Sequence, residues 1–321
     1  MRVWHGLAEI DDDLGPTVVT IGNFDGVHLG HRHVLAEARA VAAARDGTIV
    51  VAVTFDPHPM SVIRPDKAPE PLTSLDERLR LLDAAGADAV LVLTFDSELA
   101  DQEAADFAQS VIFGVLHAKA VVVGENFRFG RRARGDVDLL RALAAGRGTL
   151  VEGLPLDGTG ERTWSSTYIR SCLHDGDVSA AAQALGRLFS LRGCVVKGDQ
   201  RGRELGYPTA NVPVRTSRTA VPADGVYAGW LRRLDELDGP GPWWPAAISV
   251  GTNPTFDGTE RRVESYVLDR TDLELYDVVV EVAFADRLRG MVRFDSVHDL
   301  LEQMADDVAT CHQILTTPPP P

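Results

Sequence analysis

The spacing of hydrophobic positions along the chain changes near residue 186. Before that point, four short runs of β-branched and apolar residues alternate with helical segments. The expected strands are 18–21, 48–55, 88–95 and 119–123, and the expected helices are 34–44, 75–85, 103–116 and 177–187. Strands that alternate with helices at these spacings predict right-handed βαβ units, and therefore an α/β domain built on a parallel sheet.

Beyond residue 186, helical periodicity is largely absent until the last segment. Strand-like runs at 191–196, 246–250, 263–268 and 278–284 are separated by Gly, Pro and Asp, and a helix is expected at 296–315. This pattern predicts a small antiparallel β-barrel followed by one C-terminal helix. A chain of 321 residues can bury two cores, so we expect two domains, 1–186 and 187–321.

The first candidate site follows the first expected strand, in the segment GNFDGVHLGHRHVL that begins at Gly22. A tight turn here leads into a helix N-terminus, whose unpaired N–H groups and partial positive charge attract phosphate. His28 and His31 are three residues apart, so both can face one anion, and Gly30 leaves the backbone open to a nucleotide. In isolation, such a pair is explained as well by two histidines that are solvent-exposed or satisfied by neighbours as by a phosphate site.

Two loops follow later strands of the predicted sheet, at the carboxyl edge where parallel sheets bind ligands. The first is DPHP at 56–59, whose two prolines predict a stiff, extended exit from the sheet. The second is VGENFRFG at 123–130, which suits a mononucleotide pocket. There Phe127 or Phe129 would pack on the ligand and Asn126 would hydrogen-bond to it, unless both phenylalanines belong to the core.

The segment ERTWSSTYIR at 161–170 has the composition of a helix start, because Ser and Thr are good N-cap residues. Arg170 lies three residues after Thr167 and therefore on the same helix face. A guanidinium in that position is suited to clamping the oxygens of a triphosphate. The segment predicts a helix whose first turn faces a phosphate group.

A second constellation, KGDQRGRELGYPTAN, begins at Lys197. Its glycines and arginines predict a flexible cationic loop suited to wrapping phosphates, with Gly198, Arg201, Gly202 and Gly206 as candidates. Thr209 and Asn211 would share one face of an extended segment, and their oxygens suit Mg²⁺ bound to ATP. A polar hairpin is the alternative for PTAN. Glu264 stands in an otherwise apolar alternating strand, where a lone carboxylate usually faces solvent.

Charge and cysteine content narrow the class of partner and compartment. A net charge of −15 argues against duplex nucleic acid and against an anionic membrane surface. The three cysteines, Cys172, Cys194 and Cys311, are scattered, which favours a reducing cytoplasm over a disulfide framework. The acidic start of the chain has no long apolar run, so we expect neither a signal peptide nor a membrane span.

The segments of the first half resemble those of the bifunctional riboflavin kinase/FMN adenylyltransferases, the prokaryotic FAD synthetases. GNFDGVHLGHRHVL is similar to the signature of HxGH nucleotidyltransferases, and TFDPHP, VGENFRFG and SSTYIR are similar to further segments of the adenylyltransferase half. The resemblance implies a Rossmann-like nucleotidyltransferase domain. It implies that His28, His31 and Arg170 are catalytic and stabilise charge on the triphosphate. It also implies phosphate or ATP contacts by Gly22, Phe24, Asp25, Gly30, Ser166 and Thr167, and flavin contacts by Asn126 and Phe127.

GDQRGRELGYPTAN resembles the riboflavin kinase signature, as do SVGTNPTF and VESYVLD further on. The implied reaction transfers the γ-phosphoryl group of ATP to riboflavin, with Glu264 as general base and Thr209 and Asn211 as Mg²⁺ ligands. The implied flavin contacts are Arg289, Arg293 and Phe294. The chain departs from the family pattern at three points: Val62 and Ile63 stand where an aromatic residue is frequent, Leu188 replaces a proline, and Asp277 replaces a glycine.

The resemblance covers nearly the whole chain and implies riboflavin, FMN, FAD and ATP as partners. Two other classes stay open at this point. A nucleotidyltransferase for a different phosphorylated substrate would share the HxGH site but leave the second half unexplained. A flavin carrier or regulator built on a decayed enzyme would bind flavin without turnover. The sequence leaves self-association open.

Overall fold

The computed structural model of this protein describes residues 1–155, 158–159, 162–198, 202, 205–214, 219–235, 239–252 and 261–319. The chain forms two compact units, Met1–Ser166 and Thr167–Pro321. The division lies before helices that we expected to end the first domain, and the boundary at residues 186 and 187 stays a prediction. No helix in these described ranges is long and apolar enough to cross a membrane.

The first unit is built on a six-stranded parallel sheet in the order β1-β4-β3-β2-β5-β6. The strands are β1 (Arg2–His5), β2 (Thr17–Ile21), β3 (Ile49–Asp56), β4 (Ala89–Thr94), β5 (Ala118–Gly124) and β6 (Leu150–Leu154). A short antiparallel pair, β7 (Gly158–Thr159) and β8 (Arg162–Thr163), follows. The central strands are buried on both faces, as their continuous runs of Val, Ile and Ala require.

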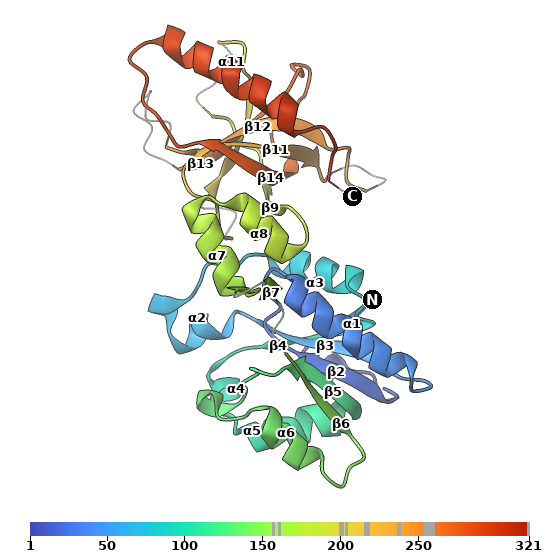
Figure 1. Ribbon diagram of the computed structural model, residues 1–321. Helices are drawn as coiled ribbons and strands as arrows, with labels where there is room; N and C mark the ends of the chain where they lie inside the picture. The colour runs from blue at the N-terminus through green and yellow to red at the C-terminus, as the bar shows by residue number, and fades with distance from the viewer. Residues whose placement is uncertain are drawn as a thin grey trace. The chain divides into compact units, whose positions relative to one another are not determined.

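Helices cover both faces of this sheet (Figure 1). One face packs against α1 (Leu29–Ala43) and α3 (Leu75–Ala84). The other packs against α5 (Ala104–Phe107), its π-helical continuation η3 (Ala108–Val115), and α6 (Val137–Ala144). The shorter helices are η1 (Leu7–Glu9), α2 (Pro59–Ile63), η2 (Pro65–Lys67), α4 (Ser97–Asp101) and η4 (Arg131–Ala133). The predicted α/β architecture is confirmed.

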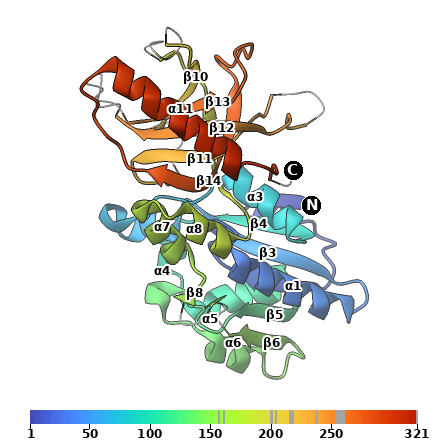
Figure 2. The ribbon, with the colours of Figure 1, turned by 45° about the horizontal axis from the view of Figure 1, so that its top comes forward.

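The second unit contains a curled antiparallel sheet in the order β10-β13-β12-β11-β14-β9 (Figure 2). Its strands are β9 (Phe189–Cys194), β10 (Thr209–Pro213), β11 (Gly225–Arg233), β12 (Trp244–Gly251), β13 (Arg262–Val267) and β14 (Val279–Arg289). The two outer strands meet where the N–H of Val196 donates to the carbonyl of Asn211 at 2.9 Å. The expected barrel is therefore present, and this bridge fixes the backbone at Asn211.

The described ranges of the second unit include α7 (Ser166–Asp175), which begins at the last residue of the first unit, α8 (Val178–Leu185) and α11 (Val297–Ile314). Ser296 caps α11 by accepting a hydrogen bond from the N–H of Asp299, as the predicted start of this helix requires. α11 covers the sheet through Cys311, which lies in a cluster with Trp230 and Leu268. Burial there raises the pKa of the Cys311 thiol to about 12.

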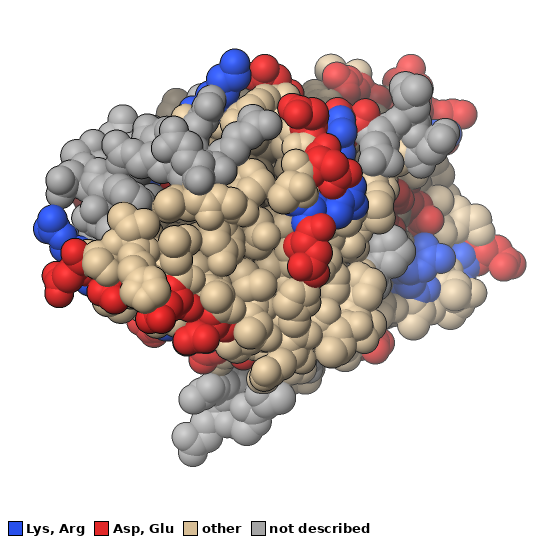
Figure 3. All heavy atoms as spheres, turned by 90° about the horizontal axis from the view of Figure 1, so that it is seen from above, with Lys and Arg blue, Asp and Glu red and all other residues tan. Residues whose placement is uncertain are grey.

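The space-filling view shows the described residues of one face of the molecule (Figure 3). Uncharged residues dominate it, and Asp and Glu side chains outnumber Lys and Arg. This balance agrees with the net charge of −15. A phosphate ligand must therefore be held by local groups, since the charge of the whole chain repels it.

Candidate active sites

The predicted turn and helix of the first site are present, and α1 begins at Leu29, five residues earlier than expected. His28 is the N-cap residue, and its Nδ1 accepts a hydrogen bond from the N–H of His31 at 3.4 Å. The two imidazole rings stack with their centroids 3.6 Å apart. A Cβ at Gly30 would lie 3.2 Å from His28 Nδ1, so the glycine makes room for the capping ring.

The environment of His31 favours its neutral form. Burial first, and then the positive charges of His28 and Arg78, lower the pKa of His31 well below 6.5. Its Nδ1 is buried and has no hydrogen-bond partner among the described residues, although the residue as a whole is partly exposed. At neutral pH this imidazole is a hydrogen-bond donor without a charge of its own.

Backbone strain is concentrated in the turn before α1. Phe24 and Val27 have φ values of 48° and 38°, which are uncommon for residues with side chains and especially for a β-branched one. Both side chains are buried, and the carboxylate of Asp25 accepts hydrogen bonds from the N–H groups of Leu72 and Thr73 at 2.9 and 3.2 Å. These contacts hold the turn in its strained conformation.

Arg78 of α3 is a part of this site that the sequence did not reveal. Its guanidinium is 4% exposed and donates to the Thr54 hydroxyl and to the Phe55 carbonyl, at 3.3 and 2.9 Å. The Thr54 hydroxyl in turn donates to the carbonyl of Asn23 at 3.1 Å. Arg78 therefore supports the turn through Thr54, whose hydroxyl contacts the backbone of Asn23. The sequence signal for this role was an arginine on the apolar face of a helix.

The two predicted motifs of this site meet at Ser166. Its hydroxyl donates to the backbone carbonyl of Asp25 at 2.8 Å, across 141 residues of sequence. Thr167 and Arg170 follow on the same helix, α7, where Thr167 is exposed and Arg170 partly buried. They belong to the second unit, whereas Ser166 ends the first.

The remaining predicted residues of the first unit lie in the loops after β3 and β5. Asn126 is exposed, and the ring of Phe127 stacks on that of buried Phe129 with centroids 5.4 Å apart. Phe129 belongs to the core, as the alternative interpretation expected. The DPHP loop is less extended than predicted, because Pro59 starts the short helix α2, with His58 as its N-cap.

The second site is built where β10 and β13 pair. Asn211 lies directly opposite Glu264, and Thr209 lies opposite Tyr266. The amide of Asn211 donates to the hydroxyl and the carbonyl of Thr209, both at 3.2 Å. The extended segment that we predicted for PTAN is therefore present, and its two polar side chains share one face with Glu264.

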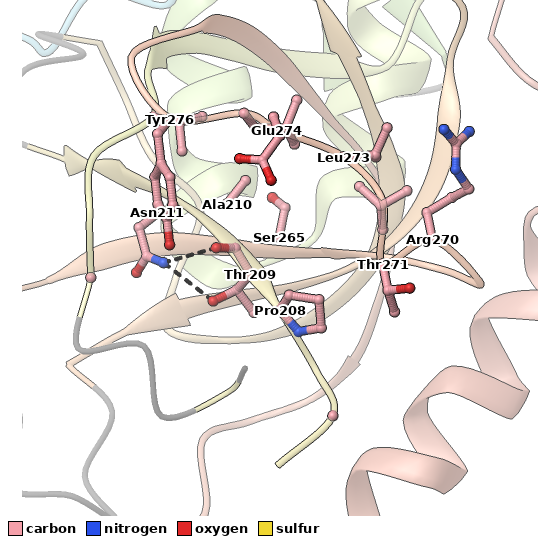
Figure 4. Close-up of a pocket in the computed structure, with 15 residues that line it drawn as sticks. Pro208, Thr209, Ala210, Asn211, Ser265, Arg270, Thr271, Leu273, Glu274 and Tyr276 are labelled. Atoms are coloured by element: carbon pink, nitrogen blue, oxygen red, sulfur yellow. Dashed lines mark hydrogen bonds between the residues drawn. The ribbon is translucent and has the colours of Figure 1, made fainter. Parts of the chain in front are cut away.

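A cavity of about 190 Å³ lies over this segment (Figure 4). Thr209, Asn211, Gly198 and Gly206 line it. A Cβ at Gly198 would approach the side-chain atoms of Asn211 to 2.8–2.9 Å, so only glycine leaves this amide in place. Arg201, the cationic residue predicted for the same loop, lies outside the described residues.

A second cavity of about 150 Å³ adjoins the first, and Thr209 lines both. Its walls include Glu264, Arg289 and Phe294, three residues predicted for catalysis or flavin binding, and Gly202. The other walls are mostly apolar: Leu205, Tyr207, Val226, Ala247, Ile248, Met291, Val292, Leu300, Met304 and Val308. Arg293 is exposed and is not among the lining residues.

Asp307 of α11 is a second feature that sequence reasoning missed. It is 6% exposed, lines the same cavity, and accepts hydrogen bonds from the guanidinium of Arg289 at 2.7 and 3.0 Å. Arg289 also lies over the ring of Phe294, 5.7 Å from its centroid. The carboxylate of Asp307 thus fixes the direction of the Arg289 side chain. Because Asp307 stands among other polar residues of α11, nothing in the sequence marked it as part of a site.

An α/β sheet with a histidine-capped helix, followed by a barrel with two adjoining cavities, is the architecture of a two-domain transferase that acts on nucleotides. Comparison with known proteins defines the family. The family model of FAD synthetase matches residues 10–168, and that of riboflavin kinase matches residues 185–315. The chain belongs to the bifunctional riboflavin kinase/FMN adenylyltransferase family.

Curated relatives named bifunctional riboflavin kinase/FMN adenylyltransferase match this chain over almost its whole length. The chain is 36% identical over 320 residues to the bifunctional riboflavin kinase/FMN adenylyltransferase of Escherichia coli K12, covering 99% of each chain. It is 31% identical to that of Bacillus subtilis, covering 96% of this chain and 95% of the relative. A crystal structure described as a macrolide-efflux protein from Streptococcus pneumoniae is 32% identical, with a TM-score of 0.85 over 97% of this chain and 98% of that one.

Proposed function

We propose that this chain makes FMN from riboflavin and ATP in its second unit, and FAD from FMN and a second ATP at the HxGH site. The observation that carries the proposal is the meeting of two cavities at Thr209, one beside the glycines and Asn211 and the other beside Glu264. Two substrates bound in these cavities would present a phosphoryl donor and an acceptor hydroxyl to each other.

In the kinase reaction, the riboflavin 5′-hydroxyl oxygen attacks the γ-phosphorus of ATP, and ADP leaves as the bond to the β,γ-bridging oxygen breaks. Glu264 takes the proton of that hydroxyl. Gly198, Gly202 and Gly206 surround the phosphates through backbone amides. The family resemblance assigns a cation of the same loop to Arg201, which lies outside the described residues. Arg289 and Phe294, which line the second cavity, orient the flavin.

Mg²⁺ is part of this proposal, and the residues fit it. In the described ranges no three His, Cys, Asp or Glu side chains gather as a metal cage. Mg²⁺ in ATP-dependent sites takes most of its ligands from phosphate and water, so two neutral oxygens such as those of Thr209 and Asn211 suffice. When bound, the ion neutralises charge on the transferring phosphoryl group.

In the adenylylation reaction, a phosphate oxygen of FMN attacks the α-phosphorus of ATP and pyrophosphate leaves. An ionised phosphate needs no general base, which agrees with an environment that keeps His31 neutral. His28 and His31 stabilise charge on the triphosphate, and Gly22, Gly30 and Ser166 shape its cradle. We assign buried Phe24 and Asp25 to support of the turn, and Asn126 and Phe127 to the flavin.

The test is to incubate the protein with riboflavin and ATP, with Mg²⁺ or with a chelator, and to separate the flavins by chromatography. We expect FMN and then FAD with Mg²⁺, and neither with the chelator. Bound riboflavin that is never converted would indicate a flavin carrier. Adenylylation of another phosphorylated substrate, with no action on flavins, would indicate the other transferase class.

A cytoplasmic location is also part of the proposal. Within the described residues, no disulfide joins Cys172, Cys194 and Cys311, as a reducing compartment favours.

A further inference from the structure

One wall of the 190 Å³ cavity has no role in the chemistry described above. Ser265 of β13, which pairs with Ala210 between Thr209 and Asn211, and the segment 270–276 form this wall (Figure 4). Six residues give this cavity an apolar surface: Val195, Pro208, Ala210, Val267, Leu273 and Leu275. Such a surface suits the flat faces of a base, so the polar groups within it identify what else is bound there.

Ser265 is the first of these polar groups. Its side chain is 1% exposed, and its hydroxyl has no hydrogen-bond partner in the described part of the chain. Its neighbours across the strands, Ala210 and Ile248, offer it none. A buried hydroxyl without a partner is uncommon, and one that lines a cavity is accounted for by a ligand that supplies the partner.

Glu274 is the second polar group. It lines the same cavity, and Figure 4 shows its carboxylate directed into the cavity. The described residues give it no hydrogen bond or ion pair. The nearby cation Arg270 is engaged elsewhere, because its guanidinium donates to Asp272 at 2.6 and 2.9 Å. Glu274 is therefore available to a ligand that presents hydrogen-bond donors.

The charge of Glu274 decides which part of ATP it meets. A carboxylate accepts hydrogen bonds and repels phosphate, so it must face the nucleoside. In the view of Figure 4 it lies between Thr209 and Asn211 on one side and Leu273 and Thr271 on the other. The ribose occupies the same middle position in ATP, between phosphates and base, and its two neighbouring hydroxyls can donate to both oxygens of a carboxylate.

We propose that Glu274 and Ser265 bind the ribose 2′- and 3′-hydroxyl groups of ATP and so determine the choice of ribonucleotide over deoxyribonucleotide in the kinase reaction. The inference rests on the proposed function of this cavity. Glu274 accepts from both hydroxyls, and the Ser265 hydroxyl completes the set of hydrogen bonds. Both residues are specificity-determining and take no part in phosphoryl transfer.

The experiment measures kcat/KM for riboflavin phosphorylation with ATP, 2′-deoxyATP and inosine triphosphate, in the wild type and in Glu274→Ala, Glu274→Gln and Ser265→Ala. We expect the wild type to prefer ATP over 2′-deoxyATP by about 10- to 100-fold, as for a lost hydrogen bond to a charged group. Glu274→Ala should bring that ratio close to one, Glu274→Gln should reduce it partly, and Ser265→Ala should reduce it by about 3- to 10-fold.

Two results keep the variants interpretable. Activity of Glu274→Ala should fall less with 2′-deoxyATP than with ATP, since 2′-deoxyATP has only the 3′-hydroxyl contact to lose, and an unchanged thermal melting midpoint shows that the unit is folded. Asp269→Asn removes a nearby exposed carboxylate that does not line the cavity, and it should leave every ratio unchanged.

Equal loss with ATP and 2′-deoxyATP in Glu274→Ala would overturn the inference. So would a change confined to the ATP-to-inosine-triphosphate ratio, since that would show that the carboxylate binds the 6-amino group of the base. A wild type that phosphorylates riboflavin but does not discriminate between the two sugars would overturn the inference and leave the proposed function standing. A wild type with no kinase activity would remove both.

Discussion

Substitution of Gly198 by alanine tests the second site with a single methyl group. The new Cβ would lie 2.8 Å from Asn211 Oδ1 and 2.9 Å from its Cγ and Nδ2, closer than such atoms approach. The amide of Asn211 is 6% exposed, so it cannot simply swing into solvent. We expect it to give up its two 3.2 Å hydrogen bonds to Thr209, and with them its place beside the proposed phosphate site.

The size of the effect follows from those contacts. Two neutral hydrogen bonds contribute about 2 kcal/mol together, which corresponds to about 30-fold in rate. Misplacement of a positioning group by about 1 Å can cost about 100-fold. We therefore expect the kcat of riboflavin phosphorylation to fall about 30- to 100-fold in Gly198→Ala, while FMN adenylylation keeps its wild-type rate.

Gly30→Ala is the matched control in the other unit. Its Cβ would lie 3.2 Å from His28 Nδ1, a milder approach, so we expect a several-fold loss of FMN adenylylation and unchanged kinase activity. Both rates come from the same chromatographic assay, supplied with riboflavin or with FMN. The reasoning is refuted if Gly198→Ala keeps kinase activity within about twofold, or if either variant loses both activities equally.

Three further predictions concern Glu281, His31 and Asp307. Burial alone would raise the pKa of Glu281, but its contacts with Arg192, Ser190 and Arg232 outweigh burial and lower this pKa. The carboxylate therefore stabilises the folded state above its unfolded pKa of about 4.3, and this stabilisation is lost as the pH falls through the folded pKa. Glu281→Gln should cost about 3–5 kcal/mol in urea unfolding at pH 7 and flatten that acid dependence; an unchanged midpoint would contradict the pairing. The pKa of His31 is lowered in the folded state, so the contribution of this residue to stability is complete above a pH of about 6.5 and declines below it. His31→Gln should remove that decline, which thermal melts measured from pH 7 to pH 5 would show. Asp307→Asn should raise the KM for riboflavin about 10-fold with little change in kcat, because the substitution frees the Arg289 side chain and leaves Glu264 in place. A fall in kcat alone would count against a role of Asp307 in positioning Arg289.

The sequence predicted the architecture well because its strongest signals are periodic. The buried runs that became β2, β3, β4 and β5 and the capped helix α11 were all expected. Two edge strands of the first sheet, β1 and β6, were missed, because they are short and half exposed. The central barrel strand β11 was also missed, since its burial on both faces removes the alternation that marks a strand.

The candidate sites show a similar division. Residues within one motif, such as His28 with His31 or Thr209 with Asn211, could be placed together from their spacing alone. The register that sets Asn211 opposite Glu264 is a property of strand pairing, 53 positions along the chain, and no local pattern encodes it. Arg78 and Asp307 act through contacts with distant backbone or side chains, so their roles appear only once the fold brings those partners near.

The most direct test of two separate active sites is a crossed pair of variants, His28→Ala and Glu264→Gln, each supplied with riboflavin or with FMN. His28→Ala should convert riboflavin to FMN at the wild-type rate and make no FAD. Glu264→Gln should lose FMN formation by about 100-fold or more, as for a positioned base, and still convert supplied FMN to FAD. Loss of both activities in either variant would contradict the account.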